Sequence, residues 1–291
     1  CTAASASGPG GDAALLERGR YLAESVLDCQ GCHTRRNPED FSRPAGPAWA
    51  GGEEFGAEWR LPGEFVTPNI TPDRETGIGD WTAAEVKRAI RDGVNRDGER
   101  LFPLMPSHFY RTMADRDLDA LVTYLRSLPP RRKPREGGVE LDFPRSAIPP
   151  LPPVEGPVPG PGDDPVERGR YLLVLANCLT CHSPSRDGRL IESRYLAGGV
   201  RITAPFGVLS TPNITPAMRT GIGDYTQADF IRLMREGIKK DGAPLYLNYM
   251  PWYVYRNMSD RDLRDMFCYL QSIEPIENNV FDPANQFPLG G

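Results

Sequence analysis

The feature that most constrains this chain is the five-residue pattern C-x-x-C-H, which occurs twice. It stands at Cys29–His33 and again at Cys178–His182. The chain has six cysteines and three histidines, so most of its cysteines and two of its histidines fall in these motifs. Two thiols separated by two residues, with an imidazole directly after them, can hold one flat cofactor by two covalent bonds and a metal ligand.

Covalent attachment of haem is the interpretation that fits both motifs. In each, the thiols would form thioethers to the two haem vinyl groups and the imidazole would bind the iron. A thioredoxin-like dithiol, a zinc site and a structural disulfide are the alternatives, but a helix is expected before each motif and four zinc ligands per site are lacking. The predicted haem-attachment residues are Cys29, Cys32, Cys178 and Cys181, and the predicted proximal iron ligands are His33 and His182.

The two motifs belong to an internal repeat. Other short sequence segments also recur, at offsets of 144 to 150 residues. Examples are 17–22 with 167–172, 67–72 with 211–216, 76–81 with 220–225, and 115–118 with 260–263. Such self-similarity predicts two copies of one domain in tandem. The expected divisions are a tether at 1–11, a first domain at 12–128, a Pro-rich extended connector at 129–163, a second domain at 164–275 and a tail at 276–291.

Each copy is predicted to contain three helices. The first, at about 13–27 and 165–176, is expected to run directly into the C-x-x-C-H motif, with Gly19 and Gly169 allowing close approach to the third helix. The second begins at a capping box, Thr82 with Glu85, and its counterpart begins at Thr226. The third covers about 115–128, and its counterpart starts at Ser259. No strand-like alternation of useful length appears, so the expected fold class is all-α with long loops.

A methionine in each copy is the candidate for the second axial iron ligand. Met105 and Met250 each precede a proline and follow a shared Asp-Gly, on a loop that can fold over the open haem face. A thioether ligand stabilises reduced iron and raises the potential. The alternative is core packing, which is the simpler role for the repeated Met113 and Met258. His108 has no histidine counterpart in the other copy.

The first residue, Cys1, predicts a lipid anchor. It is followed by small, nearly uncharged residues, as in bacterial lipoproteins whose N-terminal cysteine carries lipid after signal-peptide cleavage. The alternatives are an ordinary thiol or an arbitrary boundary. Several acyl chains on this one residue would anchor the protein stably, which predicts a position on the periplasmic side of a bacterial membrane.

The repeated motifs together resemble a known family. T-P-N-I-T-P, T-G-I-G-D-[WY], the D-G…M-P loop and the R-D-L helix are similar to those of the cytochrome c subunits of membrane-bound alcohol and sugar dehydrogenases. The resemblance implies two class I cytochrome c domains and electron transfer from periplasmic dehydrogenases toward quinone. Those subunits carry three C-x-x-C-H motifs and a membrane-associating tail, whereas this sequence has two motifs, and a lipid at Cys1 would replace the tail.

Electron transfer without substrate chemistry is the predicted function, because two six-coordinate haems leave no open iron position. The partner would be a dehydrogenase, a quinol-oxidising complex, a reaction centre or an oxidase. A formal net charge of −5 and the lack of a basic stripe argue against nucleic-acid binding. The alternatives are a dihaem enzyme, either a peroxidase or a thiosulfate dehydrogenase, and a subunit that mainly holds a larger assembly together.

Overall fold

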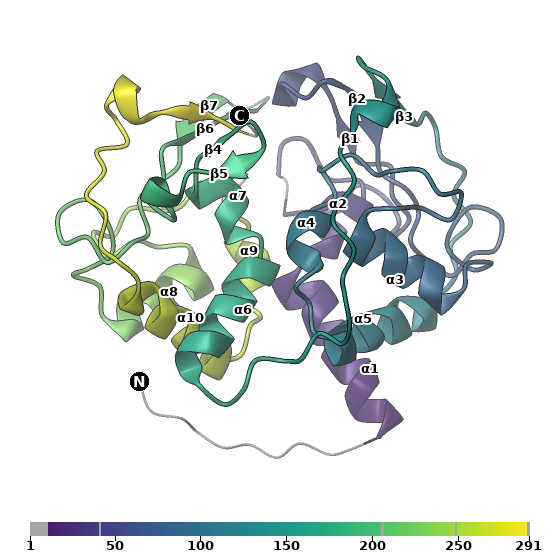
Figure 1. The fold of residues 1–291 in the computed structure, drawn as a ribbon, viewed down its shortest axis with the longest axis horizontal. Coiled ribbons are helices and arrows are strands. Elements are labelled where there is room, and N and C mark those ends of the chain that lie inside the picture. Colours follow the sequence, from purple (N-terminus) through teal and green to yellow (C-terminus); the bar gives the residue numbers. More distant parts are fainter. Residues whose placement is uncertain (1–10, 41, 205–206, 248, 290–291) are drawn as a thin grey trace. The chain divides into compact units, whose positions relative to one another are not determined.

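The structure is a computed structural model, and it describes residues 11–40, 42–204, 207–247 and 249–289. The chain divides into two compact units at Gly160–Pro161. Figure 1 follows the chain through both units from the N-terminus to the C-terminus. Cys1 and most of the predicted tether lie outside the described residues.

The first unit is built from helical segments joined by long loops and a few short strands. In chain order its elements are α1 (Asp12–Tyr21), the π-helical turn η1 (Leu22–Val26), α2 (Cys29–His33), β1 (Glu54–Phe55), η2 (Ala57–Trp59), β2 (Gly63–Val66), α3 (Ala83–Asp92), α4 (Ser107–Tyr110), α5 (Asp115–Ser127), β3 (Val139–Leu141) and η3 (Arg145–Ala147).

The second unit repeats this helical order. Its elements are α6 (Pro165–Leu175), α7 (Cys178–His182), β4 (Ser185–Arg186), β5 (Arg189–Leu190), η4 (Glu192–Arg194), β6 (Val200–Ala204), β7 (Gly207–Ser210), α8 (Gln227–Glu236), α9 (Trp252–Tyr255), α10 (Asp260–Ser272), η5 (Pro283–Asn285) and β8 (Phe287–Pro288). Thus α6 to α10 correspond to α1, α2, α3, α4 and α5.

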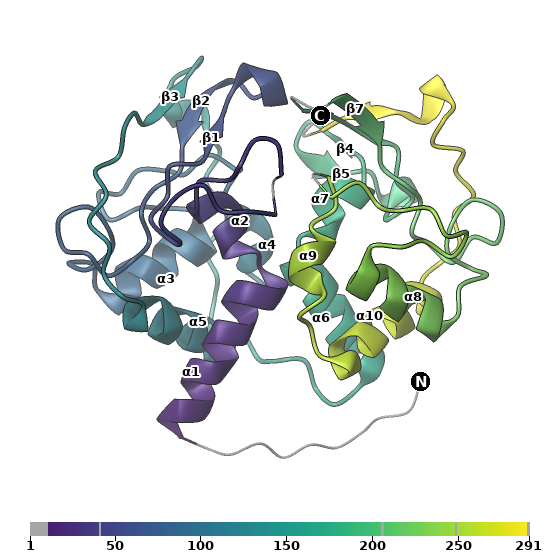
Figure 2. The ribbon, with the colours of Figure 1, turned by 180° about the vertical axis from the view of Figure 1, so that it is seen from behind.

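The first and last helices of each unit cross in close contact, as the sequence predicted. Figure 2 shows α1 running alongside α5 in the first unit. A Cβ at Gly19 would lie 1.9 Å from the Ala120 carbonyl oxygen, and a Cβ at Gly169 would lie 1.9 Å from the Asp265 carbonyl oxygen. Only glycine permits this approach, so the role predicted for both residues is confirmed.

The helix boundaries predicted from local sequence are also confirmed. Thr82 forms a full capping box with Glu85 at the start of α3, and Thr226 does so with Asp229 at the start of α8. The Ser259 side chain accepts the Asp262 backbone N–H at the start of α10. These caps satisfy N–H groups that have no partner inside the helix.

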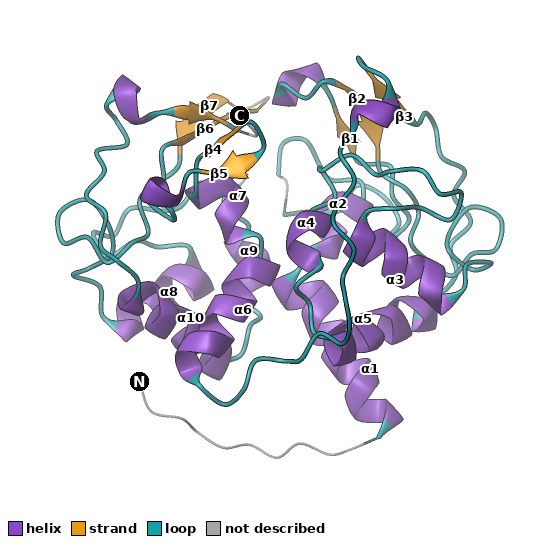
Figure 3. Ribbon diagram, in the orientation of Figure 1, coloured by secondary structure: helices purple, strands orange, loops and turns teal. Residues whose placement is uncertain are grey.

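The all-α assignment is wrong, because helices make up 37% and strands 12% of the structure. The described residues form three small sheets, with strand orders β1-β2-β3, β4-β5 and β7-β6-β8 (Figure 3). Most of these strands have only two to four residues, which is too short for an alternating pattern to show in the sequence. Two of them also pair with chain far away: β3 with β2, and β8 in parallel with β6.

The segment that leaves the last helix of each unit returns along its own unit. Nδ2 of buried Asn69 donates to the Arg131 carbonyl at 2.7 Å, and Nδ2 of buried Asn213 donates to the Ile276 carbonyl at 2.7 Å. The connector therefore packs against the first unit, and the tail packs in the same way against the second. Within the residues described, none of the helices has the length and apolar character needed to cross a bilayer.

Candidate haem sites

Each C-x-x-C-H motif forms a one-turn helix of its own, α2 or α7, after a break in the preceding helix. Asp28 and Asn177 make the break, with φ of 50° and 58° in the left-handed region. Asp and Asn tolerate this conformation better than other side chains with a Cβ. The prediction that the first helix runs directly into the motif is therefore wrong, and the turn changes the direction of the chain just before the first cysteine.

The histidine of each motif is fixed by one hydrogen bond on its ring. Nδ1 of His33 lies 2.9 Å from the Pro68 carbonyl oxygen, and Nδ1 of His182 lies 2.9 Å from the Pro212 carbonyl oxygen. Because a carbonyl oxygen only accepts, Nδ1 carries the proton and donates, which leaves the lone pair on Nε2. Each imidazole thus has a defined orientation and a nitrogen ready to bind a metal.

The prolines that accept these hydrogen bonds belong to the repeated Thr-Pro-Asn-Ile-Thr-Pro loop. The amide N–H of Gly51 donates to the His33 carbonyl at 2.9 Å, and a Cβ there would lie 2.4 Å from the Pro68 carbonyl carbon. Gly198 has the same relation to His182 and Pro212. The sequence analysis did not identify this loop as the histidine acceptor, although an Ala-Gly-Gly segment that occurs in both copies was a signal of the close approach.

The electrostatics of both motifs favour neutral ligand groups. Burial lowers the pKa of His33, with the Pro68 hydrogen bond opposing the shift and the Arg135 charge adding to it. Burial likewise lowers the pKa of His182. Burial also raises the pKa of the Cys178 thiol to about 12 and of the Cys181 thiol to about 11. Neutral imidazole is the form that binds iron.

All four motif cysteines are free thiols in the structure. Among the described residues, no group of three or more His, Cys, Asp or Glu side chains is arranged to hold a metal ion. Two free thiols on a single helical turn, followed by an imidazole whose Nε2 carries a lone pair, fit covalent attachment of one haem to each motif.

The methionine loops are tied to the motifs by a pair of tyrosines. Met105 lies two residues before α4, and the Tyr110 hydroxyl at the end of α4 donates to the Leu27 carbonyl at 3.2 Å. Met250 precedes α9 in the same way, and the Tyr255 hydroxyl donates to the Ala176 carbonyl at 2.7 Å. Each loop is therefore held against the chain that enters its motif. Sequence reasoning missed these tyrosines, although the pattern M-P-x-x-x-Y occurs in both copies.

The competing candidates for the second iron ligand occupy different positions. Met113 and Met258 are 0% and 1% exposed and belong to the core. Met105 and Met250 are only partly buried, and His108 is exposed on α4. Packing in the core accounts for Met113 and Met258, so Met105 and Met250 stay the predicted second iron ligands.

Comparison with known proteins identifies the family. The Cytochrome c family model matches residues 166–274. A diheme cytochrome c-type protein of Cereibacter sphaeroides is 33% identical, over 87% of this chain and 86% of that protein. The chain belongs to the cytochrome c family. Membership implies covalently bound haem c, which agrees with the donor groups found at both motifs.

Other relatives of this cytochrome are subunits of larger enzymes. The gluconate 2-dehydrogenase cytochrome c subunit of Pantoea cypripedii is 30% identical over 94% of this chain. The cytochrome c subunit of the quinone alcohol dehydrogenase of Gluconacetobacter polyoxogenes is 29% identical over 95% of it. The cytochrome spans only 63% and 60% of the length of these two relatives. The resemblance to dehydrogenase cytochrome subunits is thus confirmed.

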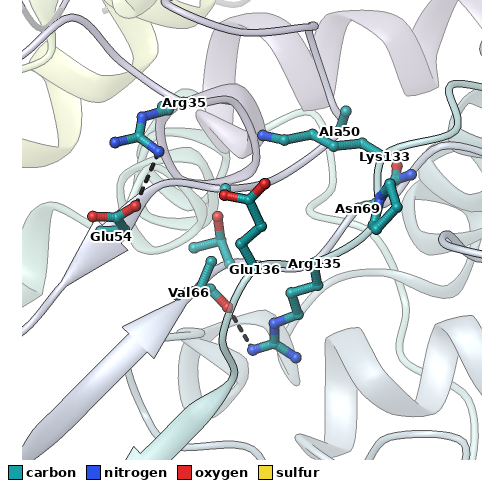
Figure 4. Close-up of a pocket in the computed structure, with 11 residues that line it drawn as sticks. Arg35, Ala50, Glu54, Val66, Asn69, Lys133, Arg135 and Glu136 are labelled. Carbon is teal, nitrogen blue, oxygen red and sulfur yellow. Dashed lines mark hydrogen bonds and ion pairs between the residues drawn. The ribbon is translucent and has the colours of Figure 1, made fainter.

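Charged side chains gather beside the first motif of the cytochrome, in a small pocket shown in Figure 4. The connector residues Lys133 and Arg135 line one side, and Arg35 forms an ion pair with Glu54 at 2.9 Å on the other. Nζ of Lys133 donates to the Gly51 carbonyl at 2.9 Å. The pocket beside the first motif is therefore lined by both basic and acidic side chains.

Proposed function

We propose that this cytochrome is a dihaem electron carrier that passes single electrons between a membrane-associated or periplasmic donor and acceptor. The observation that carries the proposal is the duplicated site: in both units two free thiols stand beside an imidazole held through Nδ1 by a proline carbonyl. Bound haem supplies a one-electron iron couple at each site.

The chain's own residues hold and shield the two cofactors. The cysteine pairs would fix each haem in place, and the hydrogen bond from Nδ1 would keep each imidazole pointing its Nε2 at the iron. Met105 and Met250 would supply the second iron ligand and would keep water and exogenous ligands from the metal. Little atomic rearrangement would then accompany the gain or loss of an electron.

The proposed setting is a subunit of a membrane-bound dehydrogenase complex that is anchored through lipid at Cys1. The relatives named as dehydrogenase cytochrome subunits support the redox-enzyme partner. Copurification from native membranes would identify the donor and acceptor, and mass spectrometry of the N-terminal peptide would test the anchor. An N-terminal free thiol would remove the anchor from the proposal.

A pyridine haemochrome assay tests the function directly. Two haems per polypeptide are expected, and a count of one or none contradicts the dihaem proposal. Met105→Ala and Met250→Ala should each remove about half of the far-red charge-transfer band that methionine coordination gives oxidised cytochromes. Met113→Leu is the matched control, since Met113 is a core residue, and it should leave that band unchanged. Steady turnover with peroxide or thiosulfate would instead favour an enzyme.

A further inference from the structure

The two haem sites differ in the charges buried around them, although their backbones repeat closely. In the first unit Glu53 and Arg36 are 6% and 7% exposed, and Glu53 Oε2 accepts the Arg36 backbone N–H at 2.6 Å. Arg36 lies three residues after His33. A buried ionisable pair therefore stands directly beside the first site.

The second site lacks this pair. Glu53 and Val200 are equivalent, because the amide N–H of each donates to a threonine hydroxyl at 3.0 Å, Thr67 or Thr211. The position of Arg36, three residues after the histidine, is taken by Ser185. A neutral residue, Asn177, also replaces Asp28 in front of the first cysteine.

The charge on Glu53 reaches the first site electrostatically. Burial raises the pKa of the Cys32 thiol to about 12, and the charges of Asp28 and Glu53 raise it further, while Arg36 opposes them. The equivalent thiol of Cys181 is shifted by burial alone. Coulomb interactions are strong where water is excluded, so a charge on Glu53 and a charge at the first iron influence each other.

We propose that Glu53 binds a proton when the first site takes up an electron and releases it when that site is oxidised. The inference rests on the proposed electron-carrier function. The electron comes from the reduced donor protein and the proton from bulk solvent, so one negative and one positive charge enter together. Reduction removes one positive charge near the Glu53 carboxylate, which makes protonation of that carboxylate more favourable.

The surroundings of Glu53 allow this exchange. The charged groups that act on Glu53 are Arg36 and Arg35 after α2 and Glu54 in β1, and Asp28 acts with Glu53 on Cys32. The pocket lined by its chain neighbours Gly52 and Glu54 also contains the connector residues Lys133, Arg135 and Glu136 (Figure 4). Burial raises the pKa of Glu53 to about 7, with its hydrogen bond from Arg36 and the charges of both arginines opposing the rise. The neighbouring Arg35 and Glu54 side chains are 49% and 61% exposed, so solvent lies close by.

Potentiometric titration of the two-haem protein at several pH values between about 5 and 9 tests the proposal. The midpoint potential of one of the two redox waves should fall as pH rises around neutrality. Its slope against pH should be at most about 59 mV per pH unit for one electron, which is about a tenfold change in the equilibrium constant. The other wave should not change with pH in that range. Glu53→Gln should abolish the slope.

One further variant and one measurement on the native protein complete the test. Glu54→Gln, which alters an exposed neighbour, should retain the dependence on pH. Infrared difference spectra of the unaltered protein should show a carboxylic acid band that grows on reduction and shifts in heavy water. The proposal is overturned if neither wave depends on pH, if the slope persists in Glu53→Gln, or if no such band exists. A haem count below two would instead reject the proposed function.

Discussion

Replacement of Gly19 by alanine is the sharpest test of how each unit holds its motif. The added Cβ would lie 1.9 Å from the Ala120 carbonyl oxygen and 2.8 Å from the Tyr124 Cβ. These atoms include the backbone of α5, which has no alternative rotamer, so α1 and α5 must move apart. Because α1 leads into α2, the separation also disturbs the chain that carries Cys29.

The expected loss of stability follows from two opposing effects. Overpacking a tight interface costs about 1–3 kcal/mol, and the backbone clash places Gly19→Ala at the upper end of this range. Alanine is favoured over glycine inside a helix by about 1 kcal/mol. The net destabilisation of the first unit should therefore be about 2 kcal/mol.

Guanidinium-induced unfolding of the haem-loaded protein measures this effect. The midpoint guanidinium concentration should fall, and the slope of the free energy of unfolding against guanidinium concentration should not change. Gly138→Ala is the matched control in the same unit, because a Cβ there meets nothing within 4 Å. Gly169→Ala repeats the experiment in the second unit. If Gly19→Ala unfolds within about 0.5 kcal/mol of Gly138→Ala, the close helix contact does not constrain this fold.

Three further predictions concern other parts of the chain. Thr82→Ala removes the capping box with Glu85 and should cost about 1 kcal/mol in denaturant unfolding, whereas Thr82→Ser should keep most of it. Asn213→Ala removes the buried donor to the Ile276 carbonyl, and should cost about 1–3 kcal/mol and speed amide exchange in the tail; unchanged exchange would contradict the role of this bond. Burial raises the pKa of Glu53 from 4.5 to about 7. At pH values between these two, the folded state therefore keeps a proton that the unfolded state has lost. The contribution of Glu53 to the free energy of unfolding should therefore fall by about 3 kcal/mol as pH rises through that window, and Glu53→Gln should lose this part of the pH dependence.

The sequence predicted what depends on short, local spacing. Both C-x-x-C-H motifs, the capping boxes at Thr82 and Thr226, and the two-copy layout can be read from residues a few positions apart or from their recurrence. The close approach at Gly19 and Gly169 was predictable for a related reason. A glycine repeated at the same place in two helices has no purpose in helix formation, so it indicates contact with another element.

The errors arose where backbone pairing or backbone direction decides the structure. The strands were missed because short segments such as β3 and β8 are defined by partners far along the chain and not by their side chains. The break before each motif was missed because Asp28 and Asn177 are compatible with either a helix or a left-handed turn. Neither property leaves a periodic signal in the sequence.

The sequence by itself indicated the chemistry of this cytochrome, because the covalent chain fixes the order of the two thiols and the imidazole whatever the fold. Only the tertiary structure decided which carbonyl orients each histidine, which tyrosine secures each methionine loop, and which of the two sites has a buried carboxylate beside it. These relations join segments tens of residues apart. The free energy that brings such segments together comes from burial of the whole unit, and no local pattern records it.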